Sequence, residues 1–229
     1  MIHKLALVMA FTLGFGLLSA ARAEEKKEWI SLFDGKSLKG WNTYHGKWKP
    51  ERSWVVKEGV LHLKKPLGFV RGTNLISEEQ FADFELEFEW KVARRANSGV
   101  MYLVRTGDAA PYLSGPEYQV NDDANYRRKP QHSAASLYDV VTAEGKKLKP
   151  TGDWNKGRIV LKDNLVEHWL NGTKVVSIKL HSADWNKRIA AGKFKNTKQF
   201  AARRKGHIAL QDHGDEVWYR NIRIRRLSP

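Results

Sequence analysis

Cysteine is absent from this chain of 229 residues. The protein can therefore form no disulfide bond, and it can hold neither a cysteine-ligated zinc ion nor a cysteine-ligated iron–sulfur cluster. Long apolar runs are scarce as well: a single one lies near the N-terminus, so no membrane-spanning helix is expected in the rest of the chain. What is present is a hydrophobic share of 41% and an aromatic share of 11%, which is enough to build a packed core.

Acidic residues are in the minority, because 25 Asp and Glu face 40 Lys and Arg and leave a net charge of +15. Such an excess is typical of proteins that bind nucleic acid or another polyanion. The basic clusters at 127–129, 146–147, 203–205 and 223–226, however, have no nucleic-acid-binding motif beside them, and they lie in turns or alternate with apolar residues. We therefore interpret them as solvated surfaces and expect no nucleic-acid partner.

The first 23 residues have the pattern of a secretory signal peptide. Lys4 supplies a positive start, residues 5–18 are almost entirely apolar, and Ala21-Arg22-Ala23 resembles a cleavage site. The alternative is an uncleaved membrane anchor, for which the apolar run is short against the usual ~20 residues. We expect a single mature domain over residues 24–229 that is secreted or periplasmic, with no membrane span after cleavage.

The mature chain shows strand patterns at short intervals and few helical ones. In residues 84–90 large apolar side chains alternate with glutamates, which predicts a strand with one buried and one polar face. Asn171-Gly172 is typical of a tight hairpin turn. The sequence thus predicts an all-β sandwich of about ten to fourteen strands. The basic segment Ser182 to Arg204 fits no strand, and we expect a loop with a short helix there.

Several segments together resemble the 3-keto-disaccharide hydrolase family. They are the run "LFDGKSLKGW" at 32–41, Asn97 to Val100, Glu117 to Val120, Ala135 to Asp139, Trp154-Asn155, Glu167 to Gly172, Gly206 to Gly214 and Arg220 to Ile222. The resemblance covers residues 29 to 227. It implies a concanavalin A-like jelly-roll β-sandwich of two antiparallel sheets. It also implies an exported bacterial enzyme that cleaves glycosides whose sugar ring is oxidised at C3. A non-catalytic, lectin-like carbohydrate-binding module is the alternative, since one fold serves many functions.

The sequence does not support ordinary two-carboxylate glycoside hydrolysis, because it has no E-x-D-x-x-E strand. A 3-keto group offers another route, since it makes the neighbouring C2 proton acidic and lets the C1 oxygen leave by elimination. Such a site needs a general base, a group that stabilises the enolate and an acid for the leaving oxygen. It needs no nucleophilic carboxylate.

Strand alternation selects the candidate catalytic residues. Tyr118 and Val120 suit the core, so their neighbours Glu117 and Gln119 share the opposite face. The same argument, applied to residues 207–213, puts Gln211 and His213 on one face. The predicted catalytic residues, which lie within the family's motifs, are Glu117, Gln119, Gln211 and His213. The alternative for each of them is an ordinary solvated surface position.

Five further residues are candidates for binding the oxidised glycoside: Asp122, His132, Trp154, Glu167 and Asp212. Glu167 is favoured over its neighbour His168, because adjacent strand residues point to opposite faces. Asp212 has an equally good structural alternative, as a turn residue that accepts backbone hydrogen bonds.

A divalent cation is left open by the sequence. Asn121, Asp122 and Asp123 form a patch of hard oxygen donors that suits such an ion, with an ordinary polar loop as the alternative. His207 and His213 would lie ~20 Å apart along one strand and could not share an ion without a bend.

Overall fold

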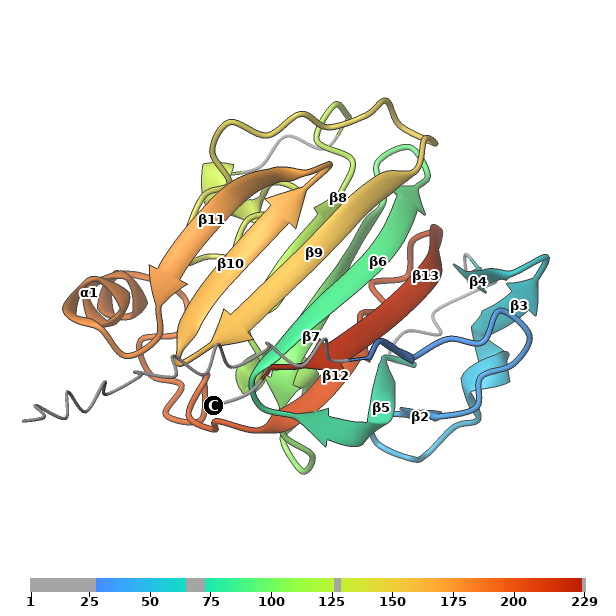
Figure 1. The fold of residues 1–229 in the computed structure, drawn as a ribbon, viewed down its shortest axis with the longest axis horizontal. Coiled ribbons are helices and arrows are strands. Elements are labelled where there is room, and N and C mark those ends of the chain that lie inside the picture. The colour runs from blue at the N-terminus through green and yellow to red at the C-terminus, as the bar shows by residue number, and fades with distance from the viewer. Residues whose placement is uncertain (1–27, 65–72, 126–128, 228–229) are drawn as a thin grey trace, which may run out of the picture.

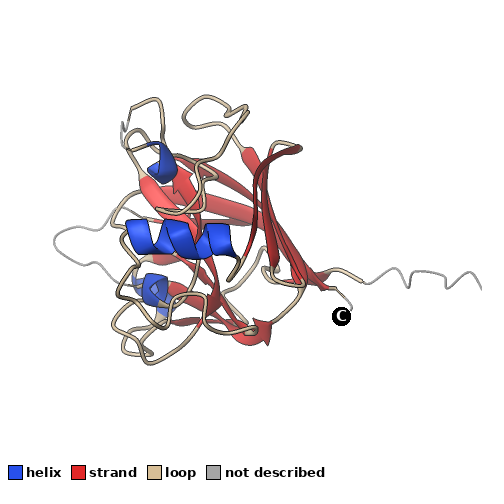
Figure 2. Cartoon of the chain, turned by 90° about the vertical axis from the view of Figure 1, so that its left-hand side faces the viewer, coloured by secondary structure: helices blue, strands red, loops and turns tan. Residues whose placement is uncertain are grey.

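The computed structural model describes residues 28–64, 73–125 and 129–227. These residues form two antiparallel β-sheets that stack face to face (Figures 1 and 2). The prediction of an all-β sandwich of two antiparallel sheets is confirmed. The expected signal peptide at 1–23 lies outside the described residues and stays a prediction. None of the helices in the described part of the chain has the length and hydropathy of a membrane-spanning segment.

The larger layer, which we call the front sheet, faces the viewer in Figure 1. Its strands follow the order β11-β10-β9-β6-β13-β4-β3, and β1 pairs with the far end of β13. The strands are β1 (Ile30–Ser31), β3 (Trp54–Lys57), β4 (Val60–Leu63), β6 (Phe84–Val92), β9 (Asn155–Lys162), β10 (Leu165–Leu170), β11 (Thr173–Lys179) and β13 (Val217–Arg226).

The smaller layer, the back sheet, has the strand order β2-β5-β12-β7-β8. Its strands are β2 (Trp41–Thr43), β5 (Leu75–Phe81), β7 (Asn97–Val104), β8 (Glu117–Asn121) and β12 (Gly206–Leu210). The helices are α1 (Ala183–Ala191) and three short 3₁₀ turns, η1 (Pro50–Arg52), η2 (Pro111–Leu113) and η3 (Pro130–His132). The expected short helix within 182–204 is thus present, beside β11 (Figure 1).

The hydrophobic core fills the space between the sheets. Phe88 of β6 meets Tyr118 of β8 edge to face, with ring centroids 5.2 Å apart. The alternation predicted for 84–90 is present, because Phe84, Leu86, Phe88 and Trp90 are buried in this core. The helices and most connecting loops lie on the side of the back sheet, so the residues that the structure describes leave the outer face of the front sheet uncovered (Figure 2).

His168 is a polar exception within the core. It comes from β10 and is fully buried, with Nε2 3.1 Å from the Tyr102 hydroxyl and Nδ1 3.0 Å from the Ala135 carbonyl oxygen. A neutral imidazole satisfies both contacts, donating from Nδ1 to the carbonyl and accepting at Nε2 from the hydroxyl. Burial lowers the pKa of His168 to about 4. Glu167 consequently points to the other face of β10, as the sequence predicts.

Replacing His168 with Gln is expected to flatten the stability profile below pH 6.5. The unfolded chain binds a proton at this residue near pH 6.5, whereas the folded protein does so only near pH 4. The free energy of unfolding of the wild type therefore decreases as pH is lowered from 6.5 to 4, by roughly 3 kcal/mol at pH 4. Urea unfolding of both proteins between pH 4 and 7 measures the difference in slope. Equal slopes would show that His168 is not buried in its neutral form.

Candidate functional site

The outer face of the back sheet carries a cluster of buried polar side chains. In β8, Tyr118 and Val120 point into the core, Glu117 and Gln119 point outward as predicted, and Asn121 shares their face. All three outward residues are nonetheless buried, at 5%, 2% and 1% exposure. Burying a polar side chain is unfavourable, and on the outer face of a sheet such side chains could remain in water. Their burial here therefore indicates a functional site rather than an ordinary surface.

Glu117 occupies a position that a glycine makes available. Glu117 pairs with Met101 of β7 and Gln119 pairs with Gly99, and the Glu117 side chain lies over this glycine, two residues from Met101 on the same face. A Cβ atom at position 99 would fall 2.1 Å from Glu117 Oε1 and 2.6 Å from Cδ. Any other residue at 99 would therefore displace the carboxyl group.

The surroundings of Glu117 favour its protonated form. Ile76, Met101 and Ala209 form an apolar cluster on the neighbouring part of this face, together with Tyr44. Burial raises the pKa of Glu117 to about 8, and the nearby ammonium of Lys193 partly opposes that rise. Once it is deprotonated, such a carboxylate is a stronger base than a solvated one, which suits proton abstraction from carbon.

Amide groups surround the carboxyl. Gln119 donates from Nε2 to Asn97 Oδ1 at 2.6 Å, and the backbone N–H of Gln211 donates to the Gly99 carbonyl at 2.9 Å. The sheet pairings thus bring Gln211 beside Gly99 and Gln119, as the sequence predicts. The side-chain oxygens of Gln119 and Gln211 are buried and have no hydrogen-bond partner in the described part of the protein. Each oxygen thus keeps acceptor capacity that the described residues do not use.

His213 lies at the end of this cluster, where β7 begins. Its Nδ1 is 3.4 Å from Asp215 Oδ2, and the same oxygen accepts a hydrogen bond from the backbone N–H of Asn97 at 3.1 Å. The imidazole is half-buried, and its contacts within the described residues connect it to the amides through Asp215 and Asn97. It is therefore a neighbour of the site rather than a direct partner of Glu117.

His132 belongs to a chain of contacts that places Lys193. Its Nε2 lies 2.7 Å from Asp139 Oδ1, and Asp139 Oδ2 accepts the backbone N–H of Lys193 at 2.6 Å. The ammonium of Lys193 lies 4.5 Å from the ring centroid of Tyr112 and 5.0 Å from that of Tyr138. Tyr138 in turn stacks on His132. This arrangement holds a cation close enough to Glu117 to affect its pKa.

Asp122 and Asp212 tie loops together. Asp212 Oδ2 accepts hydrogen bonds from both the backbone N–H and the hydroxyl of Thr73, and its Oδ1 accepts the N–H of Gly214. These contacts match the turn alternative for Asp212. Asp122 accepts from the backbone N–H of Arg95 and from the Thr151 hydroxyl. Each carboxylate already has structural partners.

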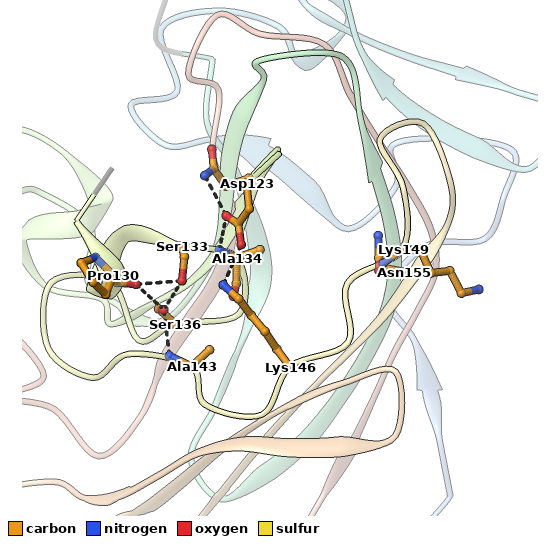
Figure 3. Close-up of polar contacts among 10 residues, drawn as sticks. Asp123, Pro130, Ser133, Ala134, Ser136, Ala143, Lys146, Lys149 and Asn155 are labelled. Atoms are coloured by element: carbon orange, nitrogen blue, oxygen red, sulfur yellow. Dashed lines mark hydrogen bonds and ion pairs between the residues drawn. The ribbon is translucent and has the colours of Figure 1, made fainter. Parts of the chain in front are cut away.

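Residues of the acidic patch at 121–123 have partners within the protein. Asp123 accepts the backbone N–H of Ala134 at 2.9 Å and pairs with Lys146 at 2.6 Å, and Asn121 also donates to it (Figure 3). Among the residues that the structure describes, no group of three or more His, Asp or Glu is placed to hold a metal ion.

Glu167 and Trp154 lie on the opposite side of the molecule from Glu117, on the outer face of the front sheet. Glu167 accepts the indole N–H of Trp169 and pairs with Lys174. Trp154 packs under Arg220, 4.1 Å from the guanidinium carbon to the ring centroid. The structure therefore divides the predicted residues between two faces.

Sequence reasoning missed several members of the cluster around Glu117. Asn97 and Gly99 belong to the segment 97–100, which the sequence analysis names as a motif, so they could have been predicted as site residues. Lys193 lies in the basic segment after α1, where no periodicity indicates its direction. Asp139 and Tyr138 follow a short stretch, Ala135 to Leu137, whose backbone pairs with the free edge of β8.

Comparisons with known proteins agree with this geometry. A family model described as a 3-keto-alpha-glucoside-1,2-lyase-like domain matches residues 28–225. A Bacteroides thetaiotaomicron protein named 3-keto-disaccharide hydrolase is 34% identical, over 87% of this chain and 79% of its own length. A Parabacteroides distasonis crystal structure, provisionally named a glycosyl hydrolase, superposes with a TM-score of 0.81 at 31% identity, covering 87% of this chain and 94% of that one.

A more distant structure shares the fold alone. The carbohydrate-binding module CBM66 from Bacillus subtilis superposes with a TM-score of 0.52 at 13% identity, covering 81% of this chain and 95% of that one.

Proposed function

This chain belongs to the family of 3-keto-alpha-glucoside-1,2-lyase-like domains and is a glycoside-cleaving enzyme, and from that premise we propose that it acts on 3-keto-glycosides with Glu117 as the base that removes the C2 proton. The observation that carries the proposal is the position of Glu117. It is buried on a polar face, seated over Gly99, and its pKa is raised to about 8. The name of the Bacteroides thetaiotaomicron relative supports the substrate class.

The proposed reaction needs one base and no nucleophile. The Glu117 carboxylate takes the proton from C2, and the C2–H electrons move to the C3 carbonyl oxygen to form an enolate. The enolate then re-forms the carbonyl and expels the C1 glycosidic oxygen, which takes up a proton and leaves as an alcohol. Water adds to the resulting enone at C1 while C2 regains a proton. The net result is hydrolysis to the 3-keto sugar and the free alcohol.

The remaining groups have separate tasks in this scheme. The ammonium of Lys193, held over Tyr112 and Tyr138, is the cation available to stabilise the enolate oxygen. The open acceptor oxygens of Gln119 and Gln211 orient the sugar through its hydroxyl groups. We assign His213, which lies beside Asp215, as the acid that protonates the leaving oxygen, since histidine is the side chain that most often transfers protons in catalysis.

A turnover assay tests the proposed substrate class. Purified protein is incubated with a set of 3-keto-glucosides and with the same glucosides before oxidation, and the released alcohol is measured. We expect release from the 3-keto compounds only, because the unoxidised sugars have no acidic C2 proton. Equal release from both sets would contradict the proposal and would indicate ordinary glycoside hydrolysis.

We also propose that the protein works outside the cytoplasm. The support is the signal-peptide pattern of residues 1–23. Determining the N-terminal residue of protein recovered from the cell envelope tests this, and we expect Glu24. A cytoplasmic protein that retains residues 1–23 would contradict it.

A further inference from the structure

A large groove lies on the outer face of the front sheet, on the opposite side of the sandwich from Glu117. Its volume is about 790 Å³. It is lined by aromatic side chains, by paired charges and by exposed backbone, including Trp29, Phe33, Glu87, Arg158, Trp169 and Arg223. No part of the mechanism above uses this groove, and the loops that cover the back sheet do not reach it (Figure 2).

Two tryptophans mark the ends of the groove. Trp169 is on β10, and Trp29 directly precedes β1, so the groove crosses β10, β9, β6, β13 and β1. At the usual spacing between strands this is roughly 19 Å, several times the width of one sugar ring. Each indole is held by a guanidinium group: Arg158 lies 4.0 Å from the Trp169 centroid, and Arg223 lies 4.4 Å from that of Trp29. The aromatic platforms are therefore fixed before any ligand binds.

Two arginines at this face of the front sheet are paired with carboxylates. Arg223 pairs with Glu87 at 2.6 Å, and Arg220 pairs with Glu89 at 2.7 Å. A β-bulge in β13 at Asn221, whose φ is +53°, allows both arginines to face β6 from the same side. Because these arginines are already matched by carboxylates, a polyanion would gain little from them, whereas a neutral ligand rich in hydroxyl groups meets both donors and acceptors.

The groove also keeps unused hydrogen-bonding capacity. Arg158 donates a hydrogen bond from Nη1 to Glu85, but its Nε is buried and has no partner within the described residues. An unpartnered buried donor beside a fixed tryptophan is a feature that a ligand hydroxyl would complete.

We propose that this groove is a second, non-catalytic site that binds a neutral oligosaccharide chain, with Trp29 and Trp169 as stacking platforms and the Arg–Glu pairs as hydrogen-bonding partners. The enzyme would then hold a glycan on one face of the sandwich while the opposite face carries out the reaction. The two faces share no residue, so loss of one function leaves the other intact.

Affinity gel electrophoresis tests this site with three probes: dextran and soluble starch as neutral glucans, and dextran sulphate as a polyanion. We expect at least one neutral glucan to retard the wild-type protein at moderate salt. Trp29→Ala and Trp169→Ala should each weaken that binding roughly tenfold. Turnover of a small 3-keto-glucoside should be the same in both variants as in wild type, and Glu117→Gln should keep wild-type retardation.

Trp48→Ala is the matched control, since Trp48 is also exposed and packed on an arginine but lies outside the groove. It should bind like wild type. Three results would each overturn the proposal: no retardation by either neutral glucan, retardation that neither groove variant weakens, or retardation by dextran sulphate alone that disappears with added salt. The proposed reaction at Glu117 is unaffected by any of them.

Discussion

Replacing Glu117 with Gln is expected to lower kcat on a 3-keto-glucoside by ~10³-fold, the usual contribution of a positioned general base. The amide has nearly the shape of the carboxyl, so it fits over Gly99, but it cannot accept the C2 proton. Steady-state kinetics on the purified variant measures the loss. For the wild type, kcat/KM should rise as pH rises through about 8, because the free enzyme must first lose the Glu117 proton.

The same substitution should stabilise the fold at alkaline pH. The folded protein holds the Glu117 proton up to about pH 8, whereas the unfolded chain releases it near pH 4.5. Between these values the folded state binds more protons, so wild-type stability decreases as pH rises. Glu117→Gln lacks this loss, and its advantage over wild type should grow from pH 4.5 to 8 in chemical unfolding.

Glu58→Gln is the control for both measurements, since Glu58 is an exposed turn residue. It should change neither kcat nor the pH dependence of stability. A Glu117→Gln protein with wild-type turnover would remove Glu117 from the reaction. A kcat/KM that falls through pH 8 would instead make Glu117 an acid.

Replacing Gly99 with Ala is expected to lower kcat by ~10²-fold, the effect of a catalytic group displaced by about 1 Å. The new Cβ would lie 2.1 Å from Glu117 Oε1, so the carboxyl has to move away from its seat. The backbone of β7 can keep its shape, because Gly99 has no unusual φ. Kinetics and thermal unfolding of the same preparation distinguish a displaced Glu117 carboxyl group from a destabilised fold.

Gly115→Ala is the matched control for this variant. Its added Cβ would also be crowded, at 2.5 Å from Val104 Cγ2, but its three nearest atoms belong to Val104, Tyr102 and Pro111 and not to Glu117. We expect it to lower stability without a specific loss of kcat. If Gly99→Ala retains wild-type kcat while it binds substrate normally, the position of the Glu117 carboxyl is not critical to the reaction.

The face of a strand on which each side chain lies could be predicted from the alternation of apolar and polar residues. These predictions are confirmed where a strand has one apolar and one polar face. Alternation correctly placed Tyr118 and Val120 in the core with Glu117 and Gln119 outside, and it separated Glu167 from His168. Alternation is a local property, because it depends only on the two-residue period of an extended backbone.

The sheet to which a strand belongs could not be read in this way. Trp154 and Glu167 face outward as predicted, but they do so on the front sheet, away from Glu117. Lys193 and Asp139 reach the cluster from irregular segments, where direction depends on long-range contacts such as Asp139 with the Lys193 backbone. These placements depend on pairings between distant parts of the chain, which one sequence without periodicity does not specify.

The two candidate roles considered for the sequence, an enzyme and a lectin-like binder, need not exclude each other. The family assigns a glycoside-cleaving enzyme, and the back sheet carries the buried acid and the amides that we propose for the reaction. The front sheet carries the tryptophans and matched charges that suit binding without reaction. One β-sandwich thus offers a polar face for each task.

The most direct test of the central claim is the kinetic isotope effect of deuterium at C2 of a 3-keto-glucoside. If Glu117 removes this proton in the step that commits the substrate to cleavage, kcat/KM for the C2-deuterated compound should be clearly lower than for the protiated one. The comparison should be made with the wild-type enzyme at a pH below about 8, where part of Glu117 is protonated and proton removal is slowed. Equal kcat/KM for the two compounds, together with full cleavage of both, would contradict C2 proton abstraction by this protein.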